Sequence, residues 1–503
     1  MATQKICWNE KLTSVWNKSF YSMDTDICKT ITEQEKYRKN IIKNDLSLTE
    51  NEKNFLCNNL QIAYDTIRID GNSAEKQQCN NCQNSHQATQ YCEFCIRKYL
   101  ANNFGNWTSG NNEIDRLIQE CQQTTVKPNY VIEWIGYDQF ENVKYLTEGG
   151  CATVYTAIWK NGCYFKWNSE RQILERFGAL KIVLKRLNNS NSNNVHWFRE
   201  VTLSFTLDNT SQFLSKCYGL TKDPTTQDYM LVLFSYHSDL RHFLKDNYQS
   251  LTLLQKYRII ENIALSLVRI HNQNIIHRDL HSGNILYGAT NAAWYISDLG
   301  LSGPVNIQLD SIYGSLPCIA PELICKRNYT TKSDMYSLGI IMWEVITGET
   351  PFGNQKFNSN SDFAFAIING YRPKIYKYIP YEYATLLKQC WDANPDNRPD
   401  ADTIMKKIQS LIRSLYNEID KKQEQPVIQS SSSKPSFSQP SLTKDKSSQK
   451  IQNSKVYTFS ISAQPRNATE EEQRAYETKQ FDLVIPEELE QPSFNDVNNS
   501  NDS

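Results

Sequence analysis

The 503-residue sequence contains no run of about 18 apolar residues, so we expect no transmembrane helix. Its longest apolar stretch, near Leu338–Ile346, contains Gly339 and Glu344 and predicts a buried helix instead. The first ten residues lack the long apolar core of a signal peptide. The chain also lacks an excess of charge of either sign, because its net charge is −1. This balance argues against a protein that binds nucleic acid or a membrane surface.

The chain has fourteen cysteines, but most of them stand alone and few are clustered. Scattered thiols in a chain without a secretion signal are expected to be reduced, so we predict a cytoplasmic protein. Apolar residues make up 39% of the chain, which is low for one compact body and predicts disordered ends. A chain of this length has room for about two to four domains.

The sequence divides into four regions by composition and periodicity. Residues 1–75 carry helix-like spacing at Ile31–Leu46 and Leu48–Ile69, and residues 76–127 hold the clustered cysteines and a short amphipathic helix. Residues 140–415 contain strand-like and helix-like segments throughout. Residues 419–503 are rich in Ser, Gln, Asn and Glu and cannot bury enough apolar surface to fold alone, so we predict a disordered tail.

The most informative motif is His277–Asn284 (His-Arg-Asp-Leu-His-Ser-Gly-Asn), which is followed downstream by Asp298–Gly300 (Asp-Leu-Gly). Phosphoryl transfer from ATP needs a carboxylate that receives a hydroxyl proton, and it needs oxygen ligands that hold Mg²⁺ across the phosphates. Asp279 is placed for the first role, and Asn284 and Asp298 are placed for the second. This spacing resembles the catalytic loop and the metal-binding turn of protein kinases.

A second segment resembles the glycine-rich loop that kinases fold over the nucleotide phosphates. Gly149 holds the middle place of that pattern, whereas Thr147 and Ala152 stand where the pattern has its first and third glycines. A tight hairpin turn is the alternative interpretation. The resemblance implies that the following residues contact the nucleotide: Leu146, Thr147, Glu148, Gly149, Gly150, Cys151, Ala152, Thr153 and Val154.

The lysine that binds the phosphates is expected in the third strand of such a domain. Lys181 and Lys185 both follow apolar runs, and we favour Lys185 because Glu200 follows it at a distance suited to a helix glutamate that pairs back. The apolar strand Tyr229–Leu233 predicts the adenine-binding hinge, with Leu233 at the back of the nucleotide pocket.

The resemblance covers about residues 140–415 and is strongest to the tyrosine-kinase-like group, in particular an expanded fungal family with a cysteine-pair module before the kinase domain. It is supported by Ala320-Pro321-Glu322, by Asp334, and by Arg398 as the expected ion-pair partner of Glu322. The resemblance implies an α+β, two-lobed kinase fold, with a small antiparallel-sheet lobe and a large helical lobe. It also implies ATP and Mg²⁺ as cofactors and a protein as substrate.

The sequence indicates less clearly whether serine and threonine or tyrosine would be the phosphorylated side chain. Ser315 stands where serine/threonine kinases usually keep a hydroxyl, whereas His281 replaces the lysine that is typical of that class. We favour Ser/Thr transfer over Tyr transfer. Two other functions stay open, namely a pseudokinase scaffold and an adaptor whose cysteine module binds partners. Neither nucleic acid nor a membrane is expected as a partner, and the oligomeric state is not predicted.

Two CxxC pairs, Cys79/Cys82 and Cys92/Cys95, are separated by nine residues. Four thiolates at this spacing suit tetrahedral Zn²⁺ and leave no open coordination position, so we predict a structural zinc site. Cysteines without metal and a redox pair are the alternatives, and His86 is a lesser alternative ligand. Such a module could bind a partner, which the sequence does not identify.

Overall fold

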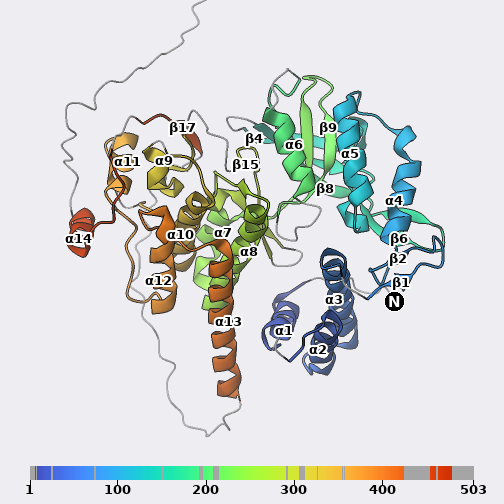
Figure 1. Ribbon diagram of the computed structural model, residues 1–503, viewed down its shortest axis with the longest axis horizontal. Helices are drawn as coiled ribbons and strands as arrows, with labels where there is room; N and C mark the ends of the chain where they lie inside the picture. The colour runs from blue at the N-terminus through green and yellow to red at the C-terminus, as the bar shows by residue number, and fades with distance from the viewer. Residues whose placement is uncertain are drawn as a thin grey trace, which may run out of the picture. The chain divides into compact units, whose positions relative to one another are not determined.

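The computed structural model describes these residues of the protein: 6, 8–23, 27–72, 75–148, 152–191, 196–207, 214–289, 293–304, 312–325, 327–353, 355, 357–423, 454–459 and 463–478. The chain divides into two compact units. Figure 1 labels many of their helices and strands. The first comprises Met1–Pro304 and Asp400–Ser448, and the second comprises Val305–Pro399 and Gln449–Ser503.

The first unit begins with three helices, α1 (Glu10–Tyr21), α2 (Ile31–Asn44) and α3 (Glu50–Asp70). Helices α2 and α3 each begin at a capping box, in which a threonine and a glutamate satisfy each other's backbone N–H groups. The helices share a buried apolar cluster: Leu12, Val15, Ile42, Leu48, Leu56, Leu60 and Tyr64. The two predicted helical segments correspond to α2 and α3.

The cysteine-containing segment follows, as small elements around two longer helices. They are β1 (Gln77–Gln78), β2 (Ser85–His86), α4 (Glu93–Asn102), η1 (Phe104–Asn106), α5 (Asn112–Thr124) and η2 (Pro128–Tyr130). The side chain of Asn111 caps α5 by accepting hydrogen bonds from the backbone N–H groups of Glu113 and Ile114. Helix α5 buries Ile114, Ile118 and Cys121 along one face, as its amphipathic pattern predicts.

A six-stranded sheet comes next, with the strand order β3-β9-β10-β8-β5-β4. Its strands are β3 (Glu133–Trp134), β4 (Phe140–Glu148), β5 (Ala152–Trp159), β8 (Leu180–Leu187), β9 (Cys217–Lys222) and β10 (Tyr229–Phe234). The five longer strands pair antiparallel, as predicted, whereas the short β3 adds to the edge of β9 in parallel. Helix α6 (His196–Thr206) follows β8 in the chain and contacts β9.

A hairpin is inserted between the second and third long strands of this sheet. It consists of β6 (Tyr164–Asn168) and β7 (Ile173–Arg176), which pair with each other and not with the main sheet. The hairpin accounts for the unusually long connection between Val154 and Lys185.

Helices dominate the rest of the first unit. The elements are β11 (Ser238–Asp239), α7 (Leu240–Asn247), η4 (Tyr248–Ser250), α8 (Leu253–Asn272), β12 (Ile275–Ile276), η5 (Ser282–Asn284), β13 (Ile285–Gly288), β14 (Ala293–Ile296), β15 (Gly303–Pro304) and α13 (Ala401–Gln423). Strands β11, β13 and β14 form a small sheet, β12 pairs with β15, and α13 packs along α8. The sheet of the small lobe is thus followed by helices, as predicted.

The second unit is also mainly helical. Its elements are β16 (Ile312–Gly314), η6 (Leu316–Cys318), α9 (Pro321–Ile324), α10 (Thr331–Thr347), α11 (Asn360–Ile368), α12 (Tyr381–Cys390), η7 (Pro395–Asn397), β17 (Lys455–Tyr457) and α14 (Glu470–Thr478). Every residue of α10 from Ser333 to Thr347 is buried, which confirms the buried helix predicted near Leu338–Ile346. Among the described helices, none is long and apolar enough to cross a membrane.

Strand β17 and helix α14 lie within the range 419–503, for which composition predicts disorder. Helix α13 also extends to Gln423, past the expected start of that tail. The prediction therefore missed local structure in the described part of this range. Strand β17 and helix α14 have no core of their own and form against other residues of the second unit.

Candidate active site and metal centre

Three predicted site residues from distant parts of the first unit meet at one point. The Nζ atom of Lys185, on β8, lies 2.6 Å from Oε1 of Glu200 on α6 and 2.8 Å from Oδ1 of Asp298, which follows β14. The side chains of Lys185 and Glu200 are only 12% and 9% exposed. The competing candidate, Lys181, lies at an exposed position of β8, so the structure brings Lys185 rather than Lys181 to the glutamate.

In this cluster, Lys185 and Asp298 each stabilise the charged form of the other. Burial alone would lower the pKa of Lys185, but the carboxylates of Asp298 and Glu200 together raise it above its ordinary value. Burial would raise the pKa of Asp298, but the Lys185 ammonium lowers it to about 2. Lysine and aspartate are therefore both charged at neutral pH, which is the state needed to bind phosphate oxygens and a divalent cation.

The turn that carries Asp298 has little free space. A Cβ atom at Gly300 would lie 2.9 Å from a carboxylate oxygen of Glu200 and 3.2 Å from one of Asp298. Asp298 itself has φ of 62°, in the left-handed region that non-glycine residues seldom adopt. Arg278, in the His277–Asn284 motif, has φ of 71°. Two such residues in one site indicate backbone strain that the surrounding contacts maintain.

Hydrogen bonds join the His277–Asn284 motif to the Asp298 turn. The Nδ2 atom of Asn284 donates to the carbonyl oxygen of Asp279 at 2.9 Å, and the backbone N–H of Ser297 donates to the Asn284 carbonyl at 2.9 Å. The Nδ1 atom of His277 accepts from the backbone N–H of Asp279 at 3.3 Å, and its Nε2 lies 3.0 Å from the Ser297 carbonyl. His277 therefore holds the two segments together.

His281 is a neighbour of Asp279 whose place the sequence did not predict. Its Nε2 lies 3.7 Å from Oδ1 of Asp279, and its Nδ1 accepts from the backbone N–H of Gly283 at 3.0 Å. Burial lowers the pKa of His281, so the imidazole is neutral at neutral pH. Because Nδ1 is the acceptor, the proton is on Nε2, the nitrogen that faces Asp279. Side-chain type alone gave no signal for this contact.

The residues expected to cover the nucleotide lie on two paired strands. Leu146, Thr147 and Glu148 are on β4, and Ala152, Thr153 and Val154 are on β5, with Glu148 opposite Thr153 in the ladder. Gly149, Gly150 and Cys151, which connect these strands in the sequence, lie outside the described residues. Val154 is paired with Lys185 across the β5–β8 ladder, so the hairpin leads directly to the lysine. Leu233 is on β10 and is partly buried.

Helix α5 contacts α6, the helix that carries Glu200. Buried Ile114, Ile118 and Cys121 of α5 share a cluster with Val201 and Phe205 of α6. The amphipathic pattern of α5 predicted an apolar face, but no sequence signal identified its partner. A segment outside the sheet and its own helix therefore contributes to the position of the glutamate.

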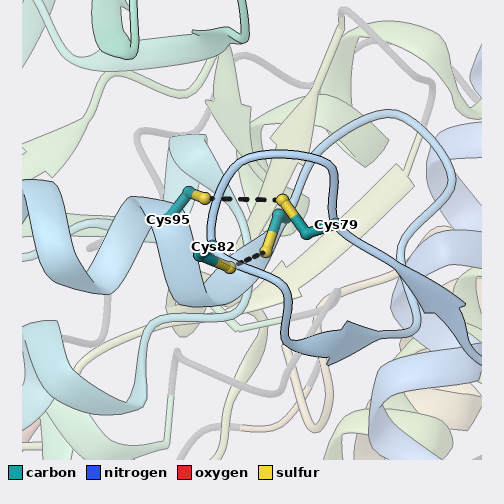
Figure 2. Close-up of side chains that lie close together, drawn as sticks. Cys79, Cys82 and Cys95 are labelled. Carbon is teal, nitrogen blue, oxygen red and sulfur yellow. Dashed lines mark hydrogen bonds between the residues drawn. The ribbon is translucent and has the colours of Figure 1, made fainter.

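The second predicted site is the cysteine cluster. The sulfur atoms of Cys79, Cys82, Cys92 and Cys95 all lie within 4.8 Å of one another. Figure 2 shows Cys79 and Cys82 on one turn facing the start of α4. The Sγ–Sγ distances are 3.7 Å for Cys79–Cys95 and 3.6 Å for Cys82–Cys92. Tetrahedral Zn²⁺ with Zn–S bonds of about 2.3 Å requires sulfur atoms about 3.8 Å apart, so the four thiols fit this metal.

The alternative ligand, His86, does not belong to the group of four. Its Nδ1 faces Glu93 at 4.0 Å instead. The amide Nδ2 of Asn84 lies 3.4 Å from Sγ of Cys82, and that of Asn81 lies 3.6 Å from Sγ of Cys95. Such N–H donors stabilise thiolates that already bind a cation.

The inserted hairpin contacts the cysteine cluster. Trp167 and Leu174 of the hairpin are buried in one apolar cluster with Cys92, Cys95 and Ile96. The side chain of Asn81 also donates a 2.5 Å hydrogen bond to Gln172, at the turn of the hairpin. No sequence signal identified the cysteine cluster as the partner of this hairpin.

In the second unit, the expected pair of Glu322 and Arg398 is present. The two guanidinium nitrogens lie 2.8 and 2.7 Å from the two carboxylate oxygens, and the arginine side chain is fully buried. Arg398 also donates to the carbonyls of Asp392 and Lys332 at 2.8 and 2.9 Å. Ser333 donates to Glu322 at 3.1 Å, so both charges have several partners.

Comparison with known proteins identifies one protein family, whose match begins at β4 and ends within α13. Residues 140–408, more than half of the chain, match the family described as protein tyrosine and serine/threonine kinase.

Relatives fall on both sides of the specificity question. A Dictyostelium discoideum protein named "Probable LIM domain-containing serine/threonine-protein kinase" is 30% identical over 226 residues, which are 44% of this chain and 34% of that protein. Ephrin type-A receptor 3 of Danio rerio is 34% identical over 185 residues, 35% of this chain and 18% of that protein. The RGS domain-containing serine/threonine-protein kinase A of Dictyostelium discoideum is 30% identical over 217 residues, 42% of this chain and 18% of that protein. The chain thus spans between 18% and 34% of the length of these curated relatives.

Proposed function

Because the chain belongs to the protein tyrosine and serine/threonine kinase family, we propose that it is an active ATP- and Mg²⁺-dependent protein kinase that phosphorylates serine and threonine side chains. The observation that carries this proposal is the bond from Lys185 to both Glu200 and Asp298. A pseudokinase scaffold has no need to keep two carboxylates and one ammonium so close together. The specific fungal family suggested by the sequence remains a prediction.

In the proposed reaction, Mg²⁺, when bound, would neutralise the charge that develops on the transferred phosphoryl group. Asn284 and Asp298 would hold that ion, because an amide and a carboxylate supply the oxygen ligands it prefers. Lys185 would bind phosphate oxygens, and Glu200 would hold the lysine in place. Leu146–Val154 and Leu233 would line the nucleotide site.

Asp279 would accept the proton of the attacking hydroxyl, a contribution of roughly 10²–10⁴ in rate for a general base. The hydrogen bonds of Asn284 and His277 to the backbone around Asp279 fix its position. The neutral His281 imidazole lies beside Asp279, with its Nε2 3.7 Å from the carboxylate.

Serine and threonine are favoured as acceptors because Ser315 keeps the hydroxyl expected of that class. The named relatives include two serine/threonine kinases and an ephrin receptor, so relatedness alone does not decide between hydroxyl types.

We further propose that Cys79, Cys82, Cys92 and Cys95 hold one structural Zn²⁺. The four sulfur atoms have the separations of a tetrahedral site, and bound zinc would tie the turn at Cys79–Cys82 to the start of α4.

The experiment that tests the kinase proposal compares two lysine variants of one strand. Lys185→Ala removes the ammonium that pairs with Glu200, whereas Lys181→Ala changes an exposed lysine on the same strand, β8. With labelled ATP, Mg²⁺ and a generic protein substrate, we expect Lys185→Ala to lose at least about 100-fold in kcat/KM and Lys181→Ala to match the wild type. Equal loss in both variants, or transfer by neither variant nor the wild type, would contradict the proposal.

A further inference from the structure

The segment from Ser454 to Thr478 is held against the second unit at several separate points. Strand β17 pairs antiparallel with β16, with Ile312 opposite Tyr457, Tyr313 opposite Val456 and Gly314 opposite Lys455. Strand β16 belongs to the stretch between Asp298 and Glu322, which corresponds to the activation segment of a kinase.

Aromatic packing accompanies the strand pairing. The rings of Tyr457 and Phe459 are stacked with centroids 5.6 Å apart, and Phe459 is only 7% exposed. Phe459 follows the end of β17, two residues after Tyr457, and the stacking places both rings on one side of the segment. The edge of β16 therefore receives an extended segment with aromatic residues at alternate positions.

The backbone after β17 follows the loop between α11 and α12. The backbone N–H of Arg466 donates to the carbonyl of Ile368 at 3.0 Å. A Cβ atom at Gly370, whose φ is +90°, would lie 2.1 Å from the backbone nitrogen of Ala468. The close approach is possible only because this residue is a glycine.

Two amide side chains of the segment act as anchors. Asn467 accepts from the backbone N–H of Ala393 at 2.9 Å and donates to Asp392 at 3.1 Å. Gln473 exchanges two hydrogen bonds with the backbone of Arg372. The side chains of Asn467 and Gln473 therefore bind backbone groups of the loops that would otherwise bind water.

The remaining contacts fix the helix that ends the segment. Arg466 binds Glu472 through two 2.9 Å contacts, and Thr469 and Glu472 form a capping box at the start of α14. The ring of Tyr476 lies on that of Tyr371, with centroids 4.8 Å apart. The described part of this tail thus owes its order to its docking surface rather than to a core of its own.

We propose that the edge of β16 that pairs with β17 is a docking site for extended peptides, and that residues 454–459, anchored by residues 463–478, are its intramolecular occupant. The segment competes with a protein substrate or other extended partner for this edge, and its release opens the edge. The binding mode is strand addition, in which backbone hydrogen bonds supply affinity and alternate side chains supply selectivity. The part that concerns substrates rests on the proposed kinase function.

The first test isolates the backbone hydrogen bonds of β17 by comparing a proline variant with an alanine variant. In an antiparallel pair, amides of successive residues point alternately toward and away from the partner strand, so Val456→Pro with Tyr457→Pro removes one pairing N–H whichever phase applies. Val456→Ala with Tyr457→Ala removes the same side chains and keeps both N–H groups. We expect hydrogen exchange of residues 312–314 to be at least about tenfold faster in the proline variant than in the alanine variant. Equal exchange would overturn the proposal.

The second test measures competition without catalysis. A labelled peptide of residues 454–478 is added in trans to the wild-type chain and to a chain that carries the two prolines together with Asn467→Ala and Gln473→Ala. Because a tethered occupant acts at a high effective concentration, fluorescence anisotropy should show at least about tenfold tighter binding to the altered chain. Equal affinity for both chains would show that the edge is not occupied from within and would overturn the proposal.

The third test joins the inference to activity. In the same altered chain, KM for a protein substrate should fall by about tenfold, while KM for ATP stays the same. An unchanged substrate KM in a working enzyme would overturn the competition. If neither chain transfers phosphate, the kinase proposal fails, whereas exchange and peptide binding still decide whether the segment occupies β16.

Discussion

Replacing Ile118 by alanine tests whether α5 holds the helix that carries Glu200. Ile118 is fully buried and shares a cluster with Val201 and Phe205 of α6. Truncation of a fully buried isoleucine to alanine costs about 2–5 kcal/mol, because apolar contacts are lost and a cavity is left.

That loss is large compared with the free-energy difference that separates two positions of a packed helix. If α6 is held by this packing, a loss of about 2 kcal/mol lowers the ratio of held to displaced α6 by about 30-fold. Displacement of α6 would separate Glu200 from Lys185, which are now 2.6 Å apart. We therefore expect kcat/KM for phosphoryl transfer to fall by at least about tenfold in Ile118→Ala.

A matched control separates this effect from a general loss of stability. Ile42 is also fully buried, but it belongs to the cluster formed by α1, α2 and α3. Ile42→Ala makes the same chemical change with a similar cost, and it should leave kcat/KM within about twofold of the wild type. The assay is steady-state phosphorylation at a temperature where circular dichroism shows both variants to be folded. Equal kcat/KM for the two variants would refute the reasoning.

Two further predictions concern the cysteine cluster and the buried ion pair. Metal analysis of the wild-type chain should find about one zinc per chain, lost in Cys82→Ser but kept in Cys57→Ser, and a folded, metal-free wild type would contradict the zinc proposal. Arg398→Met should lower the free energy of unfolding by about 3–5 kcal/mol, because it leaves the Glu322 carboxylate buried without its guanidinium. Arg116→Met, in the exposed Arg116–Glu120 pair, should change the free energy by less than about 0.5 kcal/mol in the same urea titration, and a similar effect of both changes would contradict the argument.

The sequence was most informative where chemistry demands particular side chains at fixed spacing. The pairing of Lys185 with Glu200 was predicted from their distance along the chain, and that of Glu322 with Arg398 from the resemblance to kinases. The structure brings the members of each pair together. The paired cysteines likewise predicted the four-sulfur cluster. The amphipathic and buried patterns of α5 and α10 correctly indicated helices.

Contacts between segments could not be predicted from the sequence in the same way. An apolar face of α5 requires a partner but does not specify α6, and the inserted hairpin does not specify the cysteine cluster. The neighbourhood of His281 depends on the tertiary position of Asp279. Composition predicts disorder for the segment around Asn467. The segment is nevertheless ordered, because it contacts loops elsewhere in the chain, which composition does not describe.

Asp279→Asn tests the central claim most directly, because it replaces one oxygen by an amide and removes the base without changing the size of the side chain. The account predicts that the variant binds ATP with Mg²⁺ about as tightly as the wild type and transfers labelled phosphate to a protein substrate at least about 100-fold more slowly. Equal labelling by the variant and the wild type would contradict the claim that this chain is a kinase with Asp279 as its base.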